Sequence, residues 1–119
     1  MLSNILFVLL SFMTLTFTGA RRTPIGLENA FQVAFIFTIN GDPHPHQLYI
    51  GAMGVSSYDP ASLDKLEQTL FGAALGFLRD YYQREHMLPD ETLEYWQEVD
   101  FTLDQTKSVR WQDYTLELP

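Results

Sequence analysis

The chain has 119 residues, 46% of them hydrophobic, no cysteine and a formal net charge of −8 at pH 7. This length fits a single domain over residues 1–119, and the hydrophobic fraction can form a core without disulfides or a structural metal. The lack of cysteine excludes disulfide frameworks, zinc–thiolate and iron–sulfur sites and a cysteine nucleophile. The acidity argues against direct binding to nucleic acid or an anionic membrane, since both favour Lys and Arg.

Residues 1–20 carry no charged side chain, and three interpretations of this segment are open. A secretory signal peptide would have a basic start, which is missing, although residues 17–20 loosely resemble a cleavage site. A transmembrane helix needs about 20 apolar residues, which this segment barely supplies. From residue 12 onward, apolar residues alternate with threonine, a pattern typical of a β-strand. We favour a strand over residues 1–18 and a cytoplasmic protein; a targeting segment would make the protein membrane-associated or exported.

The next part of the chain predicts a hairpin. Residues 20–26 are rich in turn formers and predict a connection. Residues 31–39 have two largely apolar alternating faces, which predicts a central strand. Successive turn residues at 40–46 then predict a loop, and residues 47–55 predict the return strand.

The main helix is predicted from residue 59 to residue 88. Asp59 is a suitable N-cap and Pro60 a suitable first-turn residue. Apolar residues at helical spacing over Leu63–Tyr81 predict a stripe that faces the core. Pro89 predicts the end, because the residue before a proline disfavours helical geometry.

Gly72 and Gly76 give this helix a Gly-x-x-x-Gly spacing. We expect a thin patch where the helix lies close against the sheet. The alternative is a homodimer, formed through this helix face or through a sheet edge.

After the helix, residues 90–97 predict one or two short helical turns, and residues 99–103 predict a strand. Residues 105–108 predict a turn before a last strand over residues 109–118. A bulge near residues 112–113 would be needed to place both aromatic residues of that strand on one face. The order β-β-β-α-β-β predicts an α+β fold: a mostly antiparallel sheet of about five strands with one long helix packed on one face.

One grouping has the residue types of a metal site, namely Asp42, His44 and His46. Imidazoles two residues apart on an extended loop can share a divalent ion with a nearby carboxylate. The spacing matches no established zinc pattern, however, so we expect a plain polar loop. The sequence contains no Gly-x-Ser-x-Gly elbow and no phosphate-cradling glycine loop. We therefore expect neither a cofactor nor enzymatic activity.

Charge is divided unevenly between the two halves of the chain. Residues 1–58 have two acidic and two basic residues, whereas residues 59–119 have thirteen carboxylates against five basic residues. Such acidity can simply keep a surface solvated. In residues 90–117, however, carboxylates are mixed with large aromatic residues, which suit the binding of a basic partner. The candidate partner-binding residues are Asp90, Glu91, Glu94, Trp96, Glu98, Asp100, Trp111, Asp113 and Tyr114.

These features predict a small, acidic, non-catalytic binding protein that occupies a basic surface of a protein or protein complex. Its specific form would be an inhibitor of a nucleic-acid-handling complex, in which carboxylates imitate a phosphate backbone. Two alternatives stay open. One is a membrane-anchored or exported domain with residues 1–20 as its targeting segment, and the other is an oligomeric structural or assembly subunit.

Overall fold

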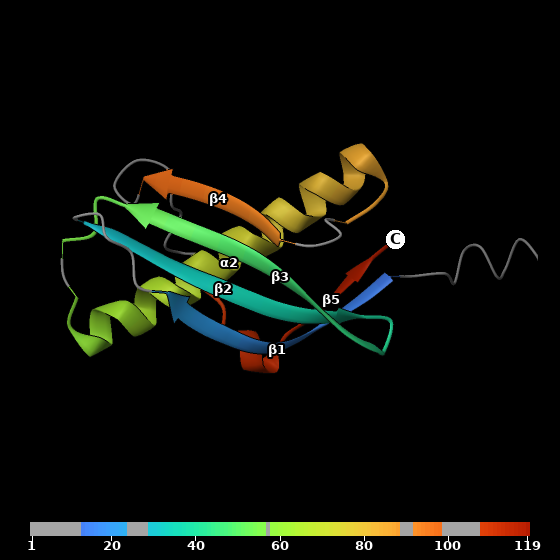
Figure 1. The fold of residues 1–119 in the computed structure, drawn as a ribbon, viewed down its shortest axis with the longest axis horizontal. Coiled ribbons are helices and arrows are strands. Elements are labelled where there is room, and N and C mark those ends of the chain that lie inside the picture. The colour runs from blue at the N-terminus through green and yellow to red at the C-terminus, as the bar shows by residue number, and fades with distance from the viewer. Residues whose placement is uncertain (1–12, 24–28, 57, 89–91, 99–107) are drawn as a thin grey trace, which may run out of the picture.

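The computed structural model describes residues 13–23, 29–56, 58–88, 92–98 and 108–119. They form two layers, a five-stranded sheet and a long helix that lies behind it (Figure 1). The strand order is β4-β3-β2-β1-β5, and all neighbouring strands are antiparallel except the parallel pair β3 and β4. The predicted α+β fold is therefore confirmed. The elements are β1 (Met13–Thr23), β2 (Ala30–Ile39), β3 (Asp42–Met53), α2 (Pro60–Glu85), β4 (Thr92–Glu98), the 3₁₀ turn η2 (Trp111–Asp113) and β5 (Thr115–Leu118).

Strand β1 shows the predicted alternation, with Leu15 and Phe17 buried and Thr16 exposed. The strand does not stop at residue 18, so the predicted connection is wrong over residues 20–23. A register shift between Phe17 and Gly19 marks a β-bulge, which lets the strand continue beside β2. The predictions for residues 1–12 and 24–26 lie outside the described residues.

The turn between β2 and β3 is shorter than predicted. Asn40 and Gly41 have φ angles of 52° and 77°, as a two-residue type I′ hairpin turn requires. The remaining residues of the predicted loop belong to β3. Their two prolines lie where the β2–β3 register shifts, because proline cannot donate to a regular ladder. The Asn40 side chain also ties the turn to β1, since its Oδ1 accepts from Thr14 N–H at 2.8 Å.

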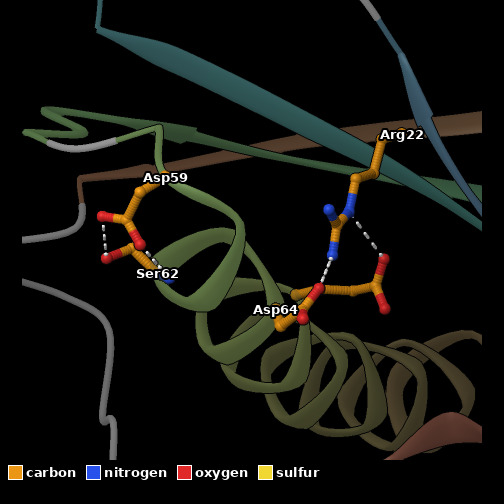
Figure 2. A network of polar contacts seen from close by, with 5 residues as sticks. Arg22, Asp59, Ser62 and Asp64 are labelled. Atoms are coloured by element: carbon orange, nitrogen blue, oxygen red, sulfur yellow. Dashed lines mark hydrogen bonds and ion pairs between the residues drawn. The ribbon is translucent and has the colours of Figure 1, made fainter.

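Helix α2 begins at the predicted cap. Asp59 Oδ1 accepts from the Ser62 N–H at 3.0 Å, and Oδ2 accepts from the Ser62 hydroxyl at 2.8 Å (Figure 2). The helix ends at Glu85, three residues before the predicted end, because His86 adopts a left-handed conformation with φ 55°. In the described residues no helix is long and apolar enough to cross a membrane.

The core lies between α2 and one face of the sheet. Phe71 of α2 is fully buried and contacts Phe17 edge-on, with ring centroids 4.7 Å apart, and Phe35 at 5.0 Å. Gly76 has no close neighbour on the sheet, because no atom outside its own stretch of helix lies within 4 Å of the position that a Cβ would take. The expectation that the helix is close-packed at Gly76 is therefore wrong.

The C-terminal quarter differs most from the prediction. Residues 92–98 form strand β4, not helical turns, because they pair in parallel with β3. The predicted strand over 109–118 is interrupted by η2, and only residues 115–118 are extended as β5. The 3₁₀ turn replaces the predicted bulge, since Trp111 and Tyr114 both pack against the core. The predicted strand at 99–103 lies outside the described part of the chain.

Candidate partner-binding sites

The candidate residues do not form one surface. Glu94, Trp96 and Glu98 belong to β4, while Trp111 and Asp113 belong to η2, beside β5. Strands β4 and β5 form opposite edges of the sheet, with three strands between them (Figure 1). The fold therefore divides the candidates between two sides of the molecule. Three others, Asp90, Glu91 and Asp100, lie outside the described residues.

By register, the β4 candidate positions belong to the sheet face turned away from α2, which we call the outer face. Glu94, Trp96 and Glu98 are in register with Tyr49, Gly51 and Met53 of β3. Those β3 residues alternate with Leu48, Ile50 and Ala52, which are fully buried in the core. Residues in register on neighbouring strands lie on the same face of a sheet. Two acidic positions and one tryptophan position thus follow one another along an edge strand.

An arginine from β1 lies on the same outer face. Arg21 donates to the Tyr49 hydroxyl at 3.2 Å and to Gln47 Oε1 at 3.4 Å. Ala34 of β2 lies between Arg21 and Tyr49 in register and is fully buried. A small residue on the central strand therefore allows two long side chains to meet across it. Arg21 is not among the sequence candidates, because its strand was expected to end earlier.

On the other side of the molecule, Tyr114 has a structural role. Its hydroxyl accepts from Arg79 Nη2 at 2.7 Å, and its ring meets Phe71 edge-on at 5.9 Å. These contacts hold the start of β5 against α2. Tyr114 is therefore a poor candidate for an anchor that a partner could bind freely.

Residues 108–112, which we call the strap, run along α2 before β5 begins. The Val109 N–H donates to the Gln68 carbonyl at 3.1 Å. Thr69 Oγ1 donates to the Lys65 carbonyl at 3.0 Å and lies 2.8 Å from Ser108 Oγ. Because a hydroxyl has one proton, Ser108 is the donor in the second contact. These two contacts fix the position of the strap.

A groove of about 290 Å³ separates α2 from the strap. The wall on the α2 side has two carboxylates and an amide, and the wall on the strap side has an indole, a guanidinium, an amide and a valine. The lining residues are Asp64, Glu67, Gln68, Val109, Arg110, Trp111 and Gln112.

Both groove carboxylates are paired with Arg22 of β1 (Figure 2). Arg22 Nη2 lies 2.5 Å from Asp64 Oδ1, and Nε lies 3.2 Å from Glu67 Oε1. The guanidinium also lies over the Phe31 ring, 5.9 Å from its centroid. The hydrogen bond to Asp64 raises the pKa of Arg22. These residues are not among the sequence candidates, although two carboxylates three residues apart on a helix share one side of it.

In the segment of Asp42, His44 and His46, the side chains make local contacts with one another and with Phe37. Asp42 Oδ1 accepts from the His44 backbone N–H at 2.9 Å, which closes a local turn. The His46 ring stacks on Phe37, with centroids 5.5 Å apart, and meets the His44 ring edge-on at 5.2 Å. Across the described part of the chain, no three His, Asp or Glu residues are placed to hold a metal ion.

Comparison with known proteins assigns no family. No family model, curated protein or solved structure matches this chain. Its function is therefore inferred from the acidic edge strand, the outer face and the groove themselves.

Proposed function

We propose that this chain is a small, non-catalytic binding protein that occupies a basic surface of a protein partner. The observation that supports this proposal is the register of β4, which places Glu94, Trp96 and Glu98 on one face at a sheet edge. The two acidic positions are about 13 Å apart along the strand. A tryptophan between carboxylates supplies contact area, while the carboxylates attract and orient a basic partner.

The distribution of charge supports the same conclusion. Helix α2 is nearly balanced, with four acidic and three basic residues. Residues 90–117 have eight carboxylates and two basic residues, so most of the net charge of −8 belongs to the segment that includes β4. A field of this sign accelerates association with basic surfaces and makes it sensitive to salt.

The specific form of the proposal is an inhibitor of a nucleic-acid-handling complex. Its carboxylates would take the place of phosphates on the basic surface of that complex. Competition tests this form directly: DNA or RNA should displace the protein from the partner, because both would occupy the same surface. A partner that binds nucleic acid and this protein at the same time would contradict it.

The general proposal is tested by capture from an extract of the native host, at low and at high salt. The double variant Glu94→Lys/Glu98→Lys should lose proteins that the unchanged chain retains. The matched control is Asp80→Lys/Glu85→Lys, which makes the same charge change at exposed positions of α2. Basic proteins retained equally by both variants would place the interface elsewhere. Partners that stay bound equally well at high salt would show that the binding is not electrostatic.

A homodimer is the second candidate, and one observation favours it. A glycine inside a helix costs about 1 kcal/mol relative to alanine, yet Gly76 makes no close contact that requires it. The open position at Gly76 leaves room for a second helix. Light scattering at several protein concentrations tests this, and a constant monomer mass would exclude it.

A further inference from the structure

We propose that the groove between α2 and the strap receives one basic side chain, lysine or arginine, from the protein partner. This inference rests on the proposed function and assigns it a second contact point. The groove and β4 are on different sides of the molecule, so the groove would extend the interface beyond the acidic edge strand.

The chemistry of the walls fits a cation. Arg22 contacts one oxygen of Asp64 and one of Glu67, so the second oxygen of each carboxylate lies outside this ion pair. Trp111 lines the opposite wall and is only partly buried. A groove lined by both carboxylates and an indole suits an ammonium or guanidinium group, for which ionic and cation–π attraction are both within reach.

The dimensions fit a single side chain. Sites for complete small molecules have volumes of roughly 300–1,000 Å³, and this groove of about 290 Å³ is at the small end of that range, which leaves room for one long side chain. The strap is held to α2 by the Val109–Gln68 and Ser108–Thr69 contacts. The groove is therefore formed before a ligand arrives, which reduces the entropic cost of binding.

Arg110 makes it possible to test whether the ligand of the groove is a cation, because removal of its charge should change the affinity in a defined direction. It is exposed and lines the groove, so it repels an incoming cation. Its removal should strengthen binding, and removal of the Asp64 and Glu67 charges should weaken it. An anionic ligand would give the opposite signs.

The experiment uses hexalysine as the probe and Trp111 emission as the signal. The chain has two tryptophans, so Trp96→Phe leaves Trp111 as the reporter. We expect a saturable change in emission. Asp64→Asn/Glu67→Gln should raise the dissociation constant roughly fivefold, and Arg110→Gln should lower it by a similar factor. The control Asp80→Asn/Glu85→Gln makes the same charge change outside the groove and should have less effect. Urea unfolding of each variant verifies that it is folded.

Three outcomes would overturn the inference. They are no response of Trp111 to hexalysine, equal effects of the groove and control variants, and tighter binding of hexaglutamate than of hexalysine. Each leaves the proposed function standing if capture still depends on Glu94 and Glu98. Loss of that dependence, with the groove response intact, would contradict the β4 interface alone.

Discussion

At the scale of single residues, Gly41 and Gly76 are a matched pair. A Cβ at either position would meet no atom of another part of the molecule within 4 Å. They differ in backbone conformation, because Gly41 has φ 77° in the hairpin turn, whereas Gly76 is in the interior of α2. Any difference between their alanine variants therefore reports backbone conformation and not steric contact.

We predict that Gly76→Ala stabilises the protein by about 1 kcal/mol, because alanine has the higher helix propensity. Gly41→Ala should destabilise it by about 1 kcal/mol or more, because a side chain is strained at that φ. Urea unfolding measures both changes. Destabilisation by Gly76→Ala would show that the position is covered, as in a homodimer, and the midpoint should then depend on protein concentration.

Arg21 and Arg22 are neighbours in sequence but lie on opposite faces of β1. Arg22 joins the sheet to α2 through Asp64 and Glu67, while Arg21 donates to Tyr49 and Gln47 of β3. We predict that Arg22→Gln costs about 1 kcal/mol of unfolding free energy. Arg21→Gln should cost less than about 0.5 kcal/mol, since its acceptors are the neutral Tyr49 hydroxyl and Gln47 amide and not carboxylates.

The Arg22 contribution should not change with pH in the neutral range. Pairing raises the pKa of Arg22, so its stabilisation is complete below the ordinary arginine value and is lost only as pH rises through the raised one. Equal destabilisation by the two arginine variants in urea would contradict the proposed difference between the faces.

At the scale of elements, the sequence predicted those features that depend on a few neighbouring residues. The Thr alternation of β1 and the Asp59 cap are each specified by a few neighbouring residues. The turn at Asn40 and Gly41 was predicted in place but too long, because the prolines that follow it belong to β3. Strand β4 was not predicted although Leu93 and Tyr95 alternate with polar residues there, because a seven-residue segment with one Leu, two Glu and one Gln fits a short helix equally well. Its parallel pairing with β3 is a tertiary choice that no local pattern encodes.

The candidate sites were harder to predict for the same reason. The groove lies between α2 and the strap, and Arg22 of β1 pairs with its carboxylates, so three parts of the chain that are far apart in sequence meet there. The division of the acidic candidates follows from the strand order, which places consecutive strands β4 and β5 at opposite edges. The residue types predicted the kind of chemistry, but the strand order decided which of these residues lie next to one another.

The start of α2 gives a prediction at the element scale. Asp59 accepts one backbone and one hydroxyl hydrogen bond from Ser62. Asp59→Ala should therefore cost about 1 kcal/mol, and Asp59→Asn should retain most of the stability, because asparagine caps helices about as well. Thermal unfolding followed by circular dichroism compares the three proteins. An equal loss in both variants would assign the effect to charge and not to capping.

At the scale of the whole molecule, the path of the chain connects distant parts of the sequence. After β4 at one edge, the strap lies against α2 and β5 completes the other edge beside β1. The contact between β1 and β5 is therefore a long-range one, and it encloses the core on that side. The acidic segment consequently has parts on both sides of the molecule.

This closure predicts how the protein unfolds. Leu116 of β5 is buried, with 2% of its surface exposed, and Glu117 beside it is exposed. Leu116→Ala should cost about 3 kcal/mol, because a large side chain is lost from a packed core, whereas Glu117→Ala should change stability by less than about 0.5 kcal/mol. The unfolding of Leu116→Ala can be followed by two probes, the circular dichroism of the helix and the emission of Trp111 in a Trp96→Phe background. Because β5 joins β1 and α2 in one core, both probes should give the same urea midpoint. If Trp111 changed at lower urea than the helix, β5 and the strap would form a separate, weaker unit. The groove that they complete would then open before the rest of the protein unfolds.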